Sequence, residues 1–177
     1  FGGYVVFRFE KAVENHPGNP YGVDFTIFGN PPGEWSEPGI VWVMKDSNGN
    51  GLPDDTWYEI AGSNYFHSET KNNYQATYFE TETRDVFWED DLGKSGWVKA
   101  NSFNLQEYYP LPEYFADYPQ DSVRFTGSLL SPAIDSSATN IKNEAFAFGY
   151  ADNHPRQQGI DLAIPDNPYT SAIEGAG

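Results

Sequence analysis

The sequence predicts an all-β protein, a jelly-roll-like β-sandwich with long loops and little helix. Several short runs alternate apolar and polar side chains, which is the pattern of half-buried strands. Thirteen Pro and 17 Gly predict many turns, and no segment longer than about two turns shows helical periodicity. Many short strands separated by turns are typical of sandwiches and jelly rolls. The 177 residues suit one domain, so residues 1–177 are expected to form a single sandwich.

Nine segments are expected to be strands. Residues 40–44 are apolar on both faces, which predicts a central strand covered on each side. Residues 56–61 follow across an acidic loop, so strand, loop and strand are expected in that order. The other expected strands are 4–10, 23–28, 74–81, 85–88, 97–100, 122–126 and 145–149.

Two connections are also expected. Residues 90–96 resemble a hairpin turn in which Gly93 and Gly96 supply positive φ. Residues 101–121 contain three Pro and four Tyr without a clear period, and we expect them to form a long ordered surface loop.

The charge of the chain excludes several classes of partner. Ten basic and 26 acidic residues give a formal charge of −16, so nucleic acid and anionic membranes are not expected as partners. Gly and Pro interrupt every window long enough to span a bilayer, so membrane insertion by this domain is not expected either. The absence of cysteine excludes disulfides, thiolate metal sites and a Cys nucleophile. An excess of carboxylates suits cation binding, although it also serves solubility alone.

The segment DSNGNGLPDD, residues 46–55, has the pattern of a calcium loop. Asp46, Asn48 and Asn50 alternate, Gly51 follows at position 6, and Asp54 occupies position 9. This is the first part of the D-x-[DN]-x-[DN]-G pattern, which wraps hard oxygens around an ion that takes about six to eight of them. Leu52 at position 7 is expected to supply its backbone carbonyl and to bury its side chain in the core.

The loop departs from the full pattern after position 9. Trp57 stands at position 12, where a bidentate Glu is usual. Asp55 is our first choice for the remaining carboxylate and Glu59 our second. Because strands rather than helices are expected on both sides, the ion would be structural rather than part of a calcium sensor. The competing interpretation is an Asn/Gly-rich hairpin loop that binds nothing.

Aromatic residues in loops are candidates for ligand contact, since sugars stack on aromatic faces. Trp42 and Trp57 lie in expected strands and are assigned to the core. The loop aromatics can instead pack ordinary loops, so a glycan site remains a hypothesis. The candidates for ligand contact are Trp35, Tyr108, Tyr109 and Tyr114.

No catalytic residues are assigned. His16, His67 and His154 lie in separate loops without metal-ligand spacing, and the chain lacks G-x-S-x-G and H-E-x-x-H. Carboxylate runs such as residues 89–91 are usually solvated in an acidic protein. Asp24, Asn30 and Glu37 could bind a second cation, but hydrogen bonding to buried backbone is the preferred interpretation. Asp152, Asn153 and Asp161 could form another metal site, but loop solvation or turn capping is preferred.

Ordered blocks along most of the chain resemble a family of bacterial cell-surface proteins, mostly from Bacteroides-type bacteria. The blocks are FGGYVVFRF (1–9), VDFTIFGN (23–30), EPGIVWVMKDSNGNGLPDDTWYEIAGS (37–63), FWEDDLGKSGWVKANSFNLQEYYP (87–110), FGYADN (148–153) and IDLA (160–163). The resemblance implies a secreted or lipid-anchored domain with a galactose-binding-like jelly roll, in a family mostly without assigned activity. It also implies a last strand after IDLA, whereas this chain ends at IEGAG, so that strand is expected to be missing or altered.

These observations lead to three functional hypotheses. The first is a non-catalytic, calcium-stabilised extracellular binding module with glycan as the leading ligand class. The second is a structural or accessory domain of a surface nutrient-uptake complex that contacts another protein. The third is a glycoside hydrolase-like enzyme. The chain begins at Phe1 rather than Met, so we expect an upstream signal peptide, lipoprotein leader or segment boundary.

Overall fold

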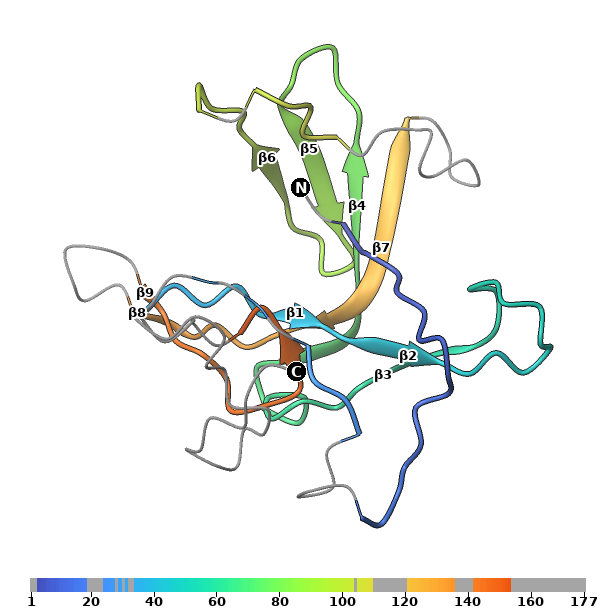
Figure 1. The fold of residues 1–177 in the computed structure, drawn as a ribbon. Coiled ribbons are helices and arrows are strands. Elements are labelled where there is room, and N and C mark those ends of the chain that lie inside the picture. Colours follow the sequence, from blue (N-terminus) through green and yellow to red (C-terminus); the bar gives the residue numbers. More distant parts are fainter. Residues whose placement is uncertain are drawn as a thin grey trace. The chain divides into compact units, whose positions relative to one another are not determined.

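A computed structural model describes residues 3–18, 24–27, 29, 31, 34–103, 105–109, 121–135 and 142–153. Within these ranges the chain is all-β, with ten short strands in antiparallel ladders and no helix (Figure 1). The chain forms two compact units. The sheet unit comprises Phe1–Val6 and Lys71–Leu129, and the hairpin unit comprises Phe7–Thr70 and Leu130–Gly177. A single sandwich over residues 1–177 stays a prediction.

The sheet unit is built on one four-stranded antiparallel sheet with the order β6-β5-β4-β7 (Figure 1). The four strands match the segments expected at 74–81, 85–88, 97–100 and 122–126, with ends shifted by a few residues. Their bounds are β4 (Lys71–Phe79), β5 (Val86–Asp90), β6 (Ser95–Val98) and β7 (Ser122–Leu129).

The core of the sheet unit lies on one face of this sheet. Ala76, Val86 and Val123 are buried there, and Val86 is only 1% exposed. The register places Ala76 opposite Phe125 and Tyr78 opposite Val123, and the rings of Tyr78 and Phe125 meet edge to face at 5.8 Å. Both faces of this sheet carry apolar side chains, so the register rather than the sequence pattern identifies the buried face.

The β5–β6 hairpin shows why its two glycines differ. Gly93 has a φ of +78°, as expected for the turn. Asp90 caps this turn, because its Oδ1 accepts hydrogen bonds from the backbone N–H of Leu92 at 3.0 Å and of Lys94 at 2.7 Å. The expectation of positive φ at Gly96 is wrong, since Gly96 lies within β6. A Cβ at Gly96 would lie 3.0 Å from Nε1 of Trp88, so Gly96 makes room for an indole packed across the strand pair.

Tyr74 gives the sheet unit a testable response to alkaline pH. Its hydroxyl donates a hydrogen bond to Oδ2 of Asp90 at 3.0 Å. Burial, followed by this bond to Asp90, raises the pKa of Tyr74 to about 12 from 10.0. The raised pKa means that the stability from Tyr74 is complete below pH 10 and is lost as the pH rises from 10 through 12.

We therefore expect Tyr74→Phe to be less sensitive than the parent protein to pH between 10 and 12. Urea unfolding at a series of pH values, with phenolate absorbance recorded in parallel, measures this. Equal loss of stability in both proteins over that window would contradict the assignment.

The hairpin unit contains three two-stranded ladders: β1 (Gly39–Ile40) with β10 (Tyr150–Ala151), β2 (Trp42–Met44) with β3 (Trp57–Glu59), and β8 (Ile134–Asp135) with β9 (Lys142–Asn143). The expected strand-loop-strand arrangement around residues 46–55 is confirmed by β2 and β3. The expectation of one central strand over residues 40–44 is wrong, because Val41 separates β1 from β2 and Val43 is exposed.

Other strand predictions also fail in the described residues. Residues 4–10 lie outside every strand, and Val5 and Phe7 are exposed. Residues 24–27 and 145–149 are not strands, while residues 23 and 28 lie outside the described ranges. An alternating pattern shows that a segment could bury one face, but a strand also needs a partner with a matching edge.

Buried polar groups join the chain segments of the hairpin unit. Asn153 is 3% exposed, and its side chain bonds to both backbone groups of Phe146: Oδ1 accepts from the Phe146 N–H at 2.8 Å, and Nδ2 donates to the Phe146 carbonyl at 2.6 Å. The hydroxyl of buried Ser36 donates to the Asn153 carbonyl at 2.7 Å. Asn153 therefore satisfies backbone groups, which agrees with turn capping; loop solvation, the other account of this residue, is wrong because Asn153 is buried.

Candidate calcium loop

The loop between β2 and β3 is organised around the carboxylate of Asp46. Its Oδ1 accepts hydrogen bonds from the backbone N–H of Gly49 at 2.7 Å and of Asn50 at 3.2 Å. Its Oδ2 accepts from the N–H of Gly51 at 2.9 Å. Gly49 and Gly51 have φ values of +72° and +73°, so the backbone can coil tightly enough to point three successive N–H groups at one carboxylate.

Asp54 lies within the same coil, held by two amides. Asn48 Nδ2 donates to Asp54 Oδ1 at 3.1 Å, and Asn50 Nδ2 donates to Asp54 Oδ2 at 2.9 Å. These bonds, first from Asn50 and then from Asn48, lower the pKa of Asp54 below its ordinary value. The structure thus brings the side chains of four of the six expected ligand residues into one hydrogen-bonded network: Asp46, Asn48, Asn50 and Asp54.

The amide oxygens of the two asparagines bond to the backbone. Asn48 Oδ1 accepts from the Asn50 N–H at 2.9 Å, and Asn50 Oδ1 accepts from the Leu52 N–H at 2.7 Å. The expectation that the Leu52 side chain enters the core is wrong, because it is 56% exposed. No described segment covers this side chain, so it stays at the surface.

The two candidates for the last carboxylate occupy different places. Asp55 lies at the base of the loop, where its Oδ2 accepts from the backbone N–H of Ser47 at 3.0 Å. Glu59 pairs with Trp42 at the end of the hairpin that is farther from the loop. The chain positions of the two carboxylates therefore favour Asp55.

Two residues outside the expected ligand set also contact the loop. Trp57 Nε1 donates to the carbonyl of Pro53 at 3.2 Å, and Arg8 Nη1 donates to the carbonyl of Gly51 at 3.4 Å. Sequence reasoning assigned Trp57 only to the core and gave Arg8 no role near the loop. Trp57 could have been expected near the loop, because it stands at position 12 of the calcium-loop pattern counted from Asp46. Nothing in the local sequence indicates the contact from Arg8, which lies 43 residues before Gly51.

The donor set fits a hard cation. Two carboxylates and two amides lie in one coil, and carboxylate and amide oxygens are preferred calcium ligands. No group of three His, Cys, Asp or Glu side chains in the described residues could hold a metal ion, so any ion here depends on the asparagines. Calcium accepts such mixed carboxylate and carbonyl ligands, whereas zinc favours His and Cys.

The expected ligand-binding aromatics lie in different units. Trp35 is in the hairpin unit and is 46% exposed. Tyr108 and Tyr109 are half-buried in the sheet unit. The Tyr108 hydroxyl accepts from the Asn101 N–H at 3.3 Å, and the Arg84 guanidinium lies 5.5 Å from its ring centroid. Burial, with Glu80 and Asp121 nearby, raises the pKa of Tyr109.

Tyr114 lies outside the described residues, as does most of the loop expected over 101–121. The role of the four aromatics in ligand contact stays a prediction.

Comparisons with known proteins place the chain in no family: no family model matches it, and a search of curated proteins finds no match. Among the residues that the structure describes, no helix is long and apolar enough to cross a membrane. The fold and the loop themselves define the protein only as an all-β protein with a candidate cation loop on a β-hairpin.

Proposed function

We propose that the chain is a non-catalytic, calcium-stabilised binding module that acts outside the cell or at the outer-membrane surface, with glycan as its ligand. The observation that carries the proposal is the loop between β2 and β3, where Asp46, Asn48, Asn50 and Asp54 form one network. The resemblance to Bacteroides-type surface proteins supports a secreted or lipid-anchored module with a galactose-binding-like jelly roll.

In this proposal the ion takes the oxygens of Asp46, Asn48, Asn50 and Asp54, the Leu52 carbonyl and a carboxylate oxygen of Asp55. The two asparagines present Nδ2 to Asp54 at 3.1 and 2.9 Å. A half-turn of each amide would direct Oδ1 toward Asp54, as a cation between them requires, and would break the bonds that Asn48 Oδ1 and Asn50 Oδ1 accept from the N–H groups of Asn50 and Leu52. The ion offsets repulsion between carboxylates in a chain of charge −16 and holds the hairpin loop in one conformation.

One observation favours the accessory-domain alternative. Val5 and Phe7 are 70% and 78% exposed, although residues 4–10 carry the alternating pattern of a strand. Such a segment can add to the sheet edge of another protein. For the hydrolase alternative, a general acid would have a raised carboxyl pKa. The described carboxyl groups with resolved shifts, Asp54 and Asp85, both have lowered pKa values, so this alternative gains no support.

Calcium titration of the chelator-treated protein tests the proposal. We expect one ion per chain by isothermal titration calorimetry and a higher melting temperature with calcium. At 100 times the dissociation constant, binding stabilises a protein by about 2.7 kcal/mol, which corresponds to roughly 5–10 °C for a chain of this length.

Magnesium is the control ion, because it demands a smaller octahedral site and keeps its waters. The absence of heat, together with the same melting temperature in calcium and in chelator, would refute the calcium proposal.

A further inference from the structure

The face of the four-stranded sheet opposite the core carries an aromatic row across three strands. The register pairs Phe79 with Phe87 and Phe87 with Trp97. The ring centroids are 5.8 Å apart in the first pair and 5.2 Å apart in the second. Trp97 remains 52% exposed, while the two phenylalanines are half-buried. Neighbouring strands lie about 4.8 Å apart, so the row extends for roughly 10 Å across the sheet.

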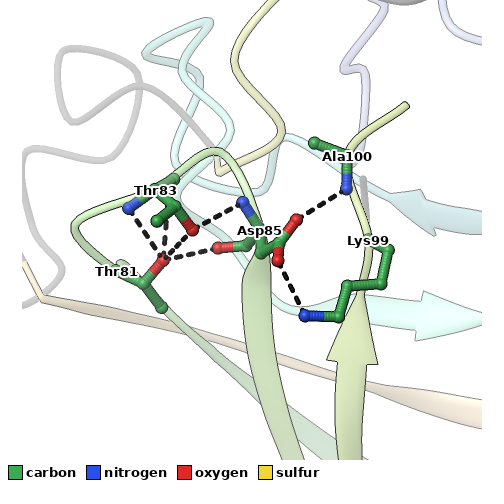
Figure 2. A network of polar contacts seen from close by, with 5 residues as sticks. All are labelled: Thr81, Thr83, Asp85, Lys99 and Ala100. Carbon is green, nitrogen blue, oxygen red and sulfur yellow. Dashed lines mark hydrogen bonds and ion pairs between the residues drawn. The ribbon is translucent and has the colours of Figure 1, made fainter. Parts of the chain in front are cut away.

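A polar network centred on Asp85 includes Lys99, which follows Trp97 by two residues (Figure 2). Lys99 Nζ donates to Asp85 Oδ2 at 2.7 Å, and the Ala100 N–H donates to Asp85 Oδ1 at 2.9 Å. The Thr81 hydroxyl donates to the Asp85 carbonyl at 2.6 Å. The bond from Lys99, followed by that from Ala100, lowers the pKa of Asp85.

The same Lys99 ammonium lies 4.8 Å from the Trp97 ring centroid. A cation at this distance is attracted to the indole face. The ring is thereby oriented before any ligand arrives, which reduces the entropy that binding must overcome.

Charges of both signs occur in the two rows that flank the aromatic row, although the chain as a whole carries −16. The next cross-strand row contains Thr77, Glu89, Ser95 and Arg124, with one charge of each sign. At the other side of the aromatic row, Lys99 pairs with Asp85. Opposite charges on each side of the aromatic row offset one another locally, so the chemistry of the row suits an uncharged ligand.

We propose that the aromatic row Phe79, Phe87 and Trp97, with the neighbouring polar row, binds a neutral polysaccharide chain. The C–H faces of pyranose rings stack on the aromatic row, and sugar hydroxyls bond to the Thr77, Glu89, Ser95 and Arg124 side chains. Aromatic residues are also enriched at the centre of protein interfaces, so self-association is measured as the competing outcome. The inference rests on the proposed function and assigns its glycan site to the sheet unit rather than to Trp35 of the hairpin unit.

Binding to soluble polysaccharides tests the site. The full chain, with calcium present, is run by affinity electrophoresis through gels that contain a neutral β-glucan, galactomannan or starch, or anionic polygalacturonate. We expect retardation by at least one neutral polymer. Trp97→Ala is expected to weaken that retention about tenfold or more, as truncation of an aromatic anchor does at binding surfaces.

Three variants make the experiment specific. Phe103→Ala removes an exposed aromatic side chain from the same unit but outside the row, and is expected to bind normally. Trp35→Ala tests the alternative aromatic site and is also expected to bind normally. Ser95→Arg places a long side chain over the row at an exposed position opposite Glu89. It is expected to weaken binding even if Trp97→Ala fails to fold.

The outcomes separate this inference from the proposed function. Retention by neutral polymers that is lost in Trp97→Ala and Ser95→Arg supports the site. Normal retention of both variants, or loss in Trp35→Ala alone, refutes the site but leaves glycan binding standing. Retention only by polygalacturonate also refutes it. If the parent protein is retained by no polymer, the glycan function itself fails. Loss of self-association in Trp97→Ala, measured by light scattering without any glycan effect, would assign the face to a protein contact.

Discussion

Replacing Asp46 by Ala is expected to abolish stabilisation by calcium. Asp46 supplies one of the two carboxylates in the loop network, and its oxygens also accept three backbone N–H groups that shape the coil. The variant therefore loses an anionic ligand and the conformation that gathers the other ligands. At a calcium concentration 100 times the parent dissociation constant, the parent protein gains about 2.7 kcal/mol and the variant gains nothing measurable.

Thermal unfolding with calcium and with chelator measures this difference. Asp91→Ala is the matched control, because Asp91 is an exposed aspartate in the other hairpin, between β5 and β6. We expect this control to keep the full calcium response. Asp46→Asn keeps the shape and an acceptor oxygen but loses the charge, so its calcium affinity is expected to lie between those of the parent and Asp46→Ala. An undiminished calcium response in Asp46→Ala would show that the ion binds elsewhere or that the response is non-specific.

Replacing Asn153 by Ala is expected to destabilise the hairpin unit by about 2–4 kcal/mol. The side chain satisfies both the N–H and the carbonyl of Phe146, at 2.8 and 2.6 Å, in a buried setting. Removing it leaves two buried backbone groups without these bonds, and each unsatisfied group costs about 1–3 kcal/mol. The truncation also leaves space beside Phe146, which adds to the loss.

Urea unfolding followed by tryptophan fluorescence measures the change as a lower midpoint. Asn72→Ala is the control, because exposed Asn72 accepts one hydrogen bond, from the Ser128 hydroxyl at 3.0 Å. Its effect is expected to stay within about 0.5 kcal/mol, as for most surface substitutions. Asn153→Asp should also be destabilising, since a carboxylate cannot donate to the Phe146 carbonyl. A midpoint for Asn153→Ala equal to that of the parent protein would show that water replaces the amide at no cost.

Local pattern predicted strands whose partners lie nearby in the chain, and it also predicted β7, whose partner β4 is distant in the sequence. The strands β5 and β6 are joined by a short turn that Gly93 and Asp90 specify, and β2 and β3 are joined by the loop at residues 46–55. In both hairpins a turn signal between two apolar runs sets the pairing. Residues 4–10 show the same alternation but form no strand, because no strand of the described structure pairs with them.

The loop follows the same division between local and distant information. The members of its hydrogen-bonded network could be named from spacing, because a coil of ten residues brings alternating side chains together whatever surrounds it. The outward position of Leu52 could not be named, since its exposure depends on whether another segment covers it. The contact from Arg8 to the Gly51 carbonyl was likewise beyond local pattern.

The sequence by itself determined the all-β class, the turn at Gly93 and the convergence of Asp46, Asn48, Asn50 and Asp54, since these depend on residues close together in the chain. Only the tertiary structure decided that Phe79, Phe87 and Trp97 form one row. It also decided that Asn153 bonds to Phe146 and accepts a hydrogen bond from Ser36. Those contacts depend on strand register and on the meeting of distant segments. Both are selected by the total burial and hydrogen bonding of the fold rather than by any local preference.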